Sequence, residues 1–156
     1  MYYIGNNRDA AMNCIQNGID TCRQGLNSCC TGVEELSANN TCRGSRALRD
    51  GIARCEQGLC QICCGIRAAG LENNREIMRG VRECREGLTD CLCGLKECCR
   101  GDIGDGALSG REGITLLEQG LNRIENVQQS PIQPNGCTAA APLENGYNLN
   151  PPFGDG

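Results

Sequence analysis

Cysteine is the residue type through which this chain could do chemistry, because 15 of its 156 residues are cysteines and none is histidine. Without histidine the chain lacks the usual general base and the commonest metal ligand, so Ser-His-Asp and Cys-His catalysis and Cys₂His₂ zinc fingers are excluded. Thiols can instead bind soft metals, exchange with disulfides or join chains covalently. We therefore expect a protein that is not an enzyme, and these three roles remain open.

The cysteines lie in segments with a helical pattern, since apolar and cysteine residues recur there in alternating steps of four and three. Four such segments occupy residues 8–37, 46–70, 74–100 and 107–128. Short polar stretches rich in Asn, Asp and Gly separate them and favour turns. Because short connections place long helices antiparallel, we expect an all-α antiparallel four-helix bundle over residues 8–128.

One short motif recurs at a spacing of about 30 residues, once in each segment. The four versions are Cys22-Arg-Gln-Gly-Leu, Cys55-Glu-Gln-Gly-Leu, Cys84-Arg-Glu-Gly-Leu and Leu117-Glu-Gln-Gly-Leu. We interpret the segments as four copies of one helix. Since Leu117 replaces the cysteine in the last copy, this position needs a small buried group more than it needs a thiol.

Glycine stands directly before the a position in heptad after heptad. A glycine inside a helix costs about 1 kcal/mol relative to alanine, so eleven of them cost on the order of 10 kcal/mol. A constant seven-residue phase indicates that something offsets this cost, and we expect these glycines to let a neighbouring helix backbone approach closely. They are Gly18, Gly25, Gly32, Gly51, Gly58, Gly65, Gly80, Gly87, Gly94, Gly113 and Gly120.

Heptad positions divide the cysteines into two sets. Those at d positions, expected in the core or as metal ligands, are Cys22, Cys29, Cys55, Cys84, Cys91 and Cys98. The other set lies at the border of the helix contacts, on outward faces, in a loop (Cys42) or in the tail (Cys137). We expect these cysteines to form cross-links: Cys14, Cys30, Cys42, Cys60, Cys63, Cys64, Cys93, Cys99 and Cys137. An odd total cannot pair completely within one chain, so Cys137 is the natural intermolecular partner.

Two interpretations of the d-position cysteines stay open. Stacked thiolates without competing histidine favour Cu(I), with Zn²⁺ second. In its inward-facing cysteines the chain loosely resembles the bacterial copper storage proteins, whose four-helix bundles are lined by cysteine. Here, however, half of the seam, which is the row of a and d positions between neighbouring helices, is Ile, Leu or Val. Alternatively, these cysteines pack as small hydrophobic groups in a narrow core.

The motif Cys60-Gln-Ile-Cys63 has the C-x-x-C spacing of redox and metal sites. In thioredoxin-like proteins this motif opens a helix after a strand, whereas here it lies in the middle of a predicted helix. The spacing alone therefore does not indicate an oxidoreductase, and no second C-x-x-C completes a zinc ribbon.

The charge and hydropathy of the chain indicate which classes of partner are disfavoured and where the protein is made. A net charge of −4 disfavours nucleic acid and anionic membranes. No apolar run approaches the length of a membrane span, and residues 1–7 lack the features of a signal peptide, so we expect synthesis in the cytoplasm. Cytosolic thiols are normally reduced and sparse, so this cysteine content favours later oxidation elsewhere.

The last segment, residues 129–156, differs in composition from the rest. It contains all five prolines and the only phenylalanine. We expect an extended arm rich in Pro, Asn and Gly that is either disordered or docks on a neighbouring subunit.

These patterns favour a structural protein that assembles with itself and is locked by disulfides between subunits into a fibre or protective layer. In composition and in this logic the chain resembles Cys-rich structural proteins of the bacterial endospore coat and exosporium. The resemblance implies a final place in an oxidising extracellular or spore-surface layer, with copies of the chain as partners and no cofactor. The alternative is a thiolate protein that binds or stores metal, Cu(I) or Zn.

Overall fold

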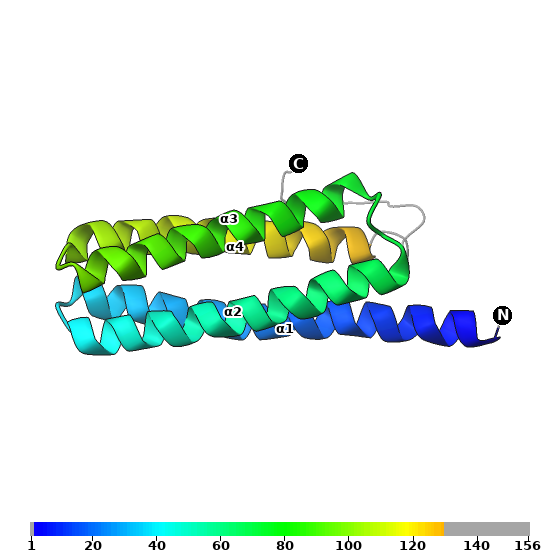
Figure 1. The fold of residues 1–156 in the computed structure, drawn as a ribbon, viewed down its shortest axis with the longest axis horizontal. Coiled ribbons are helices and arrows are strands. Elements are labelled where there is room, and N and C mark those ends of the chain that lie inside the picture. Colours follow the sequence, from blue (N-terminus) through cyan, green and yellow to red (C-terminus); the bar gives the residue numbers. More distant parts are fainter. Residues whose placement is uncertain (1, 130–156) are drawn as a thin grey trace. The chain divides into compact units, whose positions relative to one another are not determined.

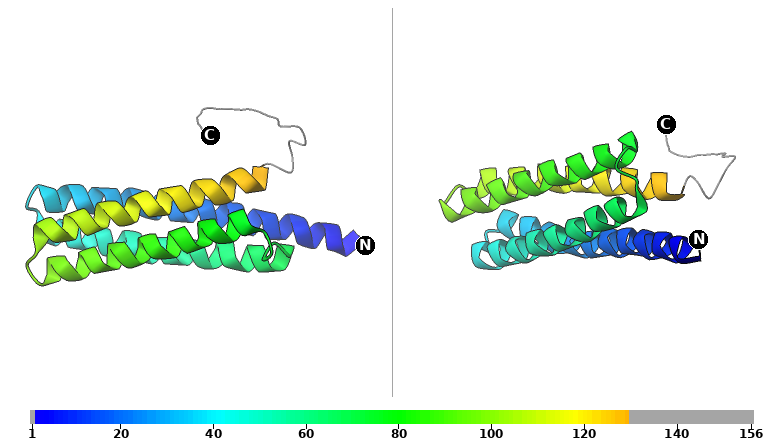
Figure 2. Two further views of the ribbon diagram at one scale, coloured as in Figure 1. Left: turned by 90° about the horizontal axis from the view of Figure 1, so that it is seen from above. Right: turned by 45° about the vertical axis from the view of Figure 1, so that its right-hand side comes forward.

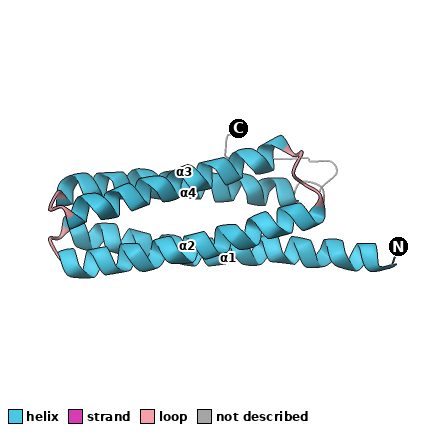
Figure 3. Ribbon diagram, viewed as in Figure 1, coloured by secondary structure: helices cyan, strands magenta, loops and turns pink. Residues whose placement is uncertain are grey.

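A computed structural model of the chain describes residues 2–129, which form four α-helices and no strand (Figures 1 and 3). The expected all-α, four-helix class is confirmed. The helices are α1 (Tyr2–Ser37), α2 (Thr41–Ala69), α3 (Arg75–Cys99) and α4 (Ile103–Gln129). The expected C-terminal arm, Cys137 included, lies outside the described residues.

Three helices begin earlier than the apolar pattern predicted. The expected starts were residues 8, 46 and 107, whereas α1 begins at Tyr2, α2 at Thr41 and α4 at Ile103. The polar stretches before α2 and α4 form first helical turns, in which Gly44 N donates to Asn40 O and Gly106 N to Asp102 O, both at 2.9 Å. The assignment of Cys42 to a loop was therefore wrong, because this residue lies in the first turn of α2.

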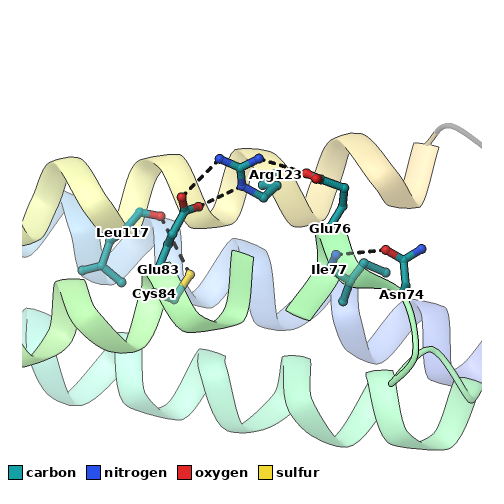
Figure 4. A network of polar contacts seen from close by, with 7 residues as sticks. All are labelled: Asn74, Glu76, Ile77, Glu83, Cys84, Leu117 and Arg123. Carbon is teal, nitrogen blue, oxygen red and sulfur yellow. Dashed lines mark hydrogen bonds and ion pairs between the residues drawn. The ribbon is translucent and has the colours of Figure 1, made fainter. Parts of the chain in front are cut away.

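Short turns with defined capping connect the helices. Gly70 ends α2 with a left-handed φ of 70°, and Leu71 N donates to Ile66 O at 3.0 Å. The side chain of Asn74 then caps α3 by accepting a hydrogen bond from Ile77 N at 3.0 Å (Figure 4). These contacts bring α3 back alongside α2.

Residues 1–125 form one compact unit, in which α1 pairs with α2 and α3 with α4 as two helical hairpins (Figure 2). Glycines bring the two backbones of each hairpin into contact. A Cβ added at Gly25 would lie 2.7 Å from Gly51 O, and one added at Gly51 would lie 2.6 Å from Gly25 O. In the second hairpin, Gly87 and Gly113 face each other in the same way, at 2.6 and 2.5 Å.

These glycine contacts run in register along both hairpins. Moving seven residues forward in α1, from Gly18 to Gly25, moves the contact seven residues backward in α2, from Gly58 to Gly51. The paired helices therefore run in opposite directions. All eleven glycines singled out in the sequence have a backbone atom of the facing helix no more than 3.0 Å from such a Cβ position. Gly44 and Gly106 extend the same rows, and their packing explains why the helices reach beyond the apolar pattern.

Small and aliphatic side chains fill the core next to these glycine rows. Its largest fully buried members are Ile15, Ile19, Leu36, Leu48, Ile62, Ile77, Leu117, Leu121 and Ile124. No aromatic residue occurs between residues 8 and 129. At the rim of the second hairpin, Arg123 bridges Glu83 at 3.0 Å and Glu76 at 2.9 Å, which ties α4 to α3 (Figure 4).

Glycine contact predicts a large stability difference between two alanine substitutions. Gly87→Ala should lower the free energy of unfolding by about 2–3 kcal/mol, because its Cβ would meet the backbone of Gly113 and Leu117. The matched control is Gly104→Ala in α4, where no atom lies within 4 Å of the added Cβ. This control should keep or raise stability by up to about 1 kcal/mol, since alanine favours helix. Urea unfolding followed by circular dichroism under reducing conditions measures both, and equal losses would contradict the contact.

Candidate functional site

The structure buries the six d-position cysteines in the seams. Cys22, Cys29, Cys55, Cys84 and Cys91 are 0% exposed and Cys98 is 4% exposed. The Cys22 thiol donates to Cys55 O at 3.3 Å, and the Cys55 thiol donates back to Cys22 O at 3.5 Å. In the second hairpin, Cys84 donates to Leu117 O at 3.9 Å (Figure 4). These thiols thus act as small groups that satisfy carbonyls of the facing helix.

Some buried thiols also meet across the interface between the two hairpins. Hydrogen bonding with Cys55 is the largest cause that raises the pKa of Cys29, to about 12, although a hydrogen bond with Cys91 acts in the opposite direction. The hydrogen bond with Cys29, followed by burial, raises the pKa of Cys91. The thiols that influence the pKa of Cys29 in α1 therefore belong to α2 and α3.

Burial dominates the chemistry of the other central pair. It raises the pKa of Cys22 and that of Cys84 to about 12, and the neighbouring Cys84 and Cys63 add to the effect at Cys22. Both thiols are consequently protonated at neutral pH. A protonated thiol is a poor nucleophile, so the seam does not supply reactive cysteines.

Metal binding requires several ligands around one point, and residues 2–129 contain no group of three or more Cys, Asp or Glu arranged to hold a metal ion. The seam itself shows why. Leu117 takes the place of the motif cysteine in α4, and the thiols of Cys84 and Cys91 donate to carbonyl oxygens of that helix, those of Leu117 and Gly110.

The second set of cysteines lies on the outside of the helices. Cys14, Cys42, Cys60, Cys64, Cys93 and Cys99 are exposed, whereas Cys30 and Cys63 are partly buried. All fourteen cysteines of the described residues are free thiols. The exposed ones are spread over α1, α2 and α3, and α4 contains no cysteine.

Polar residues line the two borders between the hairpins, which we call rims: one between α1 and α4, the other between α2 and α3. Between α1 and α4, Arg23 forms an ion pair with Glu125 at 2.9 Å and donates to Asn122 at 2.8 Å. A groove of about 460 Å³ lies at this rim and is lined by Arg23, Leu26, Asn27, Cys30, Glu118 and Asn122. Burial, and next Glu118, raises the pKa of Cys30.

The rim between α2 and α3 contains an arginine and a thiol. The Arg85 guanidinium Nη2 lies 3.6 Å from the Sγ of Cys63. Sequence reasoning missed both rim arginines, Arg23 and Arg85, as partners of these sites. Each follows the motif cysteine directly and so occupies an e position, which is the signal that could have placed them at the border of the seam.

The raised pKa values predict a loss of stability at high pH. The thiols of Cys22 and Cys84 ionise near 9.0 when unfolded but near 12 when folded, so their contribution is intact below pH 9 and is lost as the pH rises toward 12. Urea midpoints measured across this range should fall. A Cys22→Ala, Cys84→Ala variant should show a flatter decline, and an unchanged slope would contradict the assignment.

No family model matches this chain, and neither a curated protein nor a solved structure shows significant similarity to it. No helix within residues 2–129 combines the length and the hydropathy of a membrane span. The functional argument therefore depends on the division between buried and exposed thiols and on the polar rims.

Proposed function

We propose that this chain is a structural protein that assembles with copies of itself and is joined by disulfides formed between its outward cysteines. The observation that carries the proposal is the division of the thiols. Six are buried and hydrogen-bonded or packed in the seams, whereas six others are exposed on three helices. Free exposed thiols are reactive liabilities unless bond formation is their role.

The position of the exposed thiols supports an extended assembly. Cys60 and Cys64 lie about one helical turn apart on α2, while Cys93 lies on α3 and Cys14 on α1. A closed dimer needs only one self-complementary surface. A chain that can form bonds from several helices can be linked to more than one neighbour, as a fibre or layer requires. A fibre or protective layer, of the spore-envelope type, is therefore the assembly that we propose.

The fold also leaves these thiols free for assembly. Contacts between glycine backbones and a buried aliphatic core hold the described helices together, and the cysteines of residues 2–129 are free thiols. The bundle can then fold in a reducing cytoplasm and be cross-linked after it reaches an oxidising setting. Each bond formed later would add to the stability of the assembly, as disulfides typically contribute about 2–4 kcal/mol.

Cross-linking predicts a ladder of disulfide-bonded species. Oxidised wild-type protein should give bands above the dimer on a non-reducing gel and a single monomer band with reductant. Replacing the cross-linking set by serine should abolish the ladder; this set is Cys14, Cys30, Cys42, Cys60, Cys63, Cys64, Cys93, Cys99 and Cys137. The matched control, Cys84→Ala in the seam, should keep it. A wild-type monomer band without reductant would overturn the proposal.

One observation favours a second function, thiolate binding of Cu(I). The pKa of Cys29 is influenced by Cys55 in its own hairpin and by Cys91 in the other, and we propose Cys29 and Cys91 as the two thiolates that would hold one ion. Titration of the reduced protein with Cu(I) against a competing chelator should then give at least about one ion per chain. A Cys29→Ala, Cys91→Ala variant should lose that ion while Cys22→Ala keeps it. Wild-type stoichiometry well below one would exclude the site.

A further inference from the structure

Residues 62 positions apart make matching contacts in the two hairpins. Gly25 packs against Gly51 in the first hairpin, as Gly87 packs against Gly113 in the second. Gly18 with Gly58, and Gly80 with Gly120, repeat the relation. In this correspondence α3 takes the place of α1, and α4 takes the place of α2. Residues at equivalent positions of the two hairpins can therefore be compared directly.

At the rim between α1 and α4, the e-position arginine Arg23 faces two acceptors. Arg23 lies 2.8 Å from the amide oxygen of Asn122 and 2.9 Å from the carboxylate of Glu125. These two acceptors are three residues apart on α4, so they share one face of that helix. The rim arginine is thus held by a neutral acceptor and an anion.

The equivalent rim between α2 and α3 has thiols in both of these places. Arg85 corresponds to Arg23, and the residues that correspond to Asn122 and Glu125 are Cys60 and Cys63. The Arg85 guanidinium lies 3.6 Å from the Sγ of Cys63, which occupies the place of the carboxylate. The C-x-x-C motif therefore places one thiol, that of Cys63, against a guanidinium and a second thiol, that of Cys60, one turn away on the same helix.

This placement separates the two thiols by environment. Cys63 is partly buried and touches the guanidinium, whereas Cys60 is exposed one turn away. The Arg85 contact thus places a positive charge directly beside the Cys63 sulfur, and the nucleophilic form of a thiol is its anion. The protonated thiols of the seam offer no comparable site, since burial works against ionisation there.

We propose that Cys60 and Cys63, of which Cys63 contacts Arg85, are a reactive dithiol that reacts with disulfides. The substrate class is a disulfide, either of a small thiol or of another protein chain. Cys63 is the attacking thiol, Cys60 resolves the mixed disulfide, and Arg85 is a positioning residue whose guanidinium donates to the Cys63 sulfur.

The exchange balances in two steps. The Cys63 thiolate attacks one sulfur of R–S–S–R, that S–S bond breaks, and R–S⁻ leaves and takes up a proton from solvent. Cys60 then loses its proton to solvent and attacks the Cys63 sulfur of the mixed disulfide, which releases the second R–S⁻. The dithiol is oxidised by two electrons to a Cys60–Cys63 disulfide, and R–S–S–R is reduced to two thiols.

The same bond can be passed to another copy of the chain. An outward thiolate of a second copy attacks the Cys60–Cys63 disulfide, so that one intermolecular bond forms and one of the two cysteines is released as a thiol. Only this last step rests on the proposed cross-linking function. Formation of the Cys60–Cys63 disulfide itself does not require assembly.

The test uses the reduced full-length chain, with glutathione disulfide as the probe. Samples are quenched by alkylation and the modified cysteines are mapped by mass spectrometry. The Cys60–Cys63 disulfide should form before Cys93, an exposed thiol of α3, acquires glutathione. Arg85→Gln should slow its formation roughly three- to fivefold, in line with the strength of exposed charge pairs. Arg85→Lys should retain most of the rate.

Two controls separate a direct effect of the charge from a loss of structure. Arg23→Gln removes the equivalent arginine and should leave the Cys60–Cys63 rate unchanged. The double change Asn122→Cys, Glu125→Cys builds the same motif against Arg23, and it should create a second dithiol that oxidises about as fast as the first. Circular dichroism checks that each variant is folded.

The inference is overturned if Cys63 reacts no faster than Cys93, or if Arg85→Gln leaves its rate unchanged. This outcome is distinct from failure of the proposed function. A Cys60–Cys63 disulfide in a chain that stays monomeric on a non-reducing gel would support the dithiol and reject cross-linking. A ladder without this disulfide would do the reverse.

Discussion

Direct contact between glycine backbones is the constraint on which the rest of this structure depends. At each row, an added methyl group would lie against a carbonyl oxygen of the facing helix. The spacing within a hairpin is therefore set by the backbones, and the neighbouring d positions must hold side chains that fit a narrow seam. Cysteine is small enough, and its S–H can satisfy a carbonyl across the seam, as the reciprocal pair of Cys22 and Cys55 does.

This constraint gives the cysteines two different chemistries. In the seam, burial raises the pKa of thiols such as Cys84, so these groups are neutral and inert at physiological pH. On the outer surfaces and at the rims, thiols remain free in a bundle that is already held together by its core. A single residue type thus packs in the core on one face of a helix and presents free thiols on another.

The interface between the hairpins is built differently from the hairpins themselves. Its centre is aliphatic and thiol-lined, and its borders are polar, with Arg23 on one side and Arg85 on the other. Glycine contacts 62 residues apart match in the two hairpins, so the two borders can be compared position by position. The positions of Asn122 and Glu125 at one border correspond to those of Cys60 and Cys63 at the other, and this difference is the basis of the proposed dithiol.

The sequence by itself determined the helical class and the faces that are buried, because a heptad pattern is a local property of each helix. It also placed the seven-residue glycine rows beside the seam. Tertiary structure decided where the helices start, that Cys42 lies in a helix, and which residue Arg85 contacts. Gly44 and Gly106 continue their helices because they pack against a facing backbone, and Arg85 meets Cys63 because the register between hairpins aligns their e positions. Such contacts join residues distant in sequence, so periodicity within one helix carries no information about them.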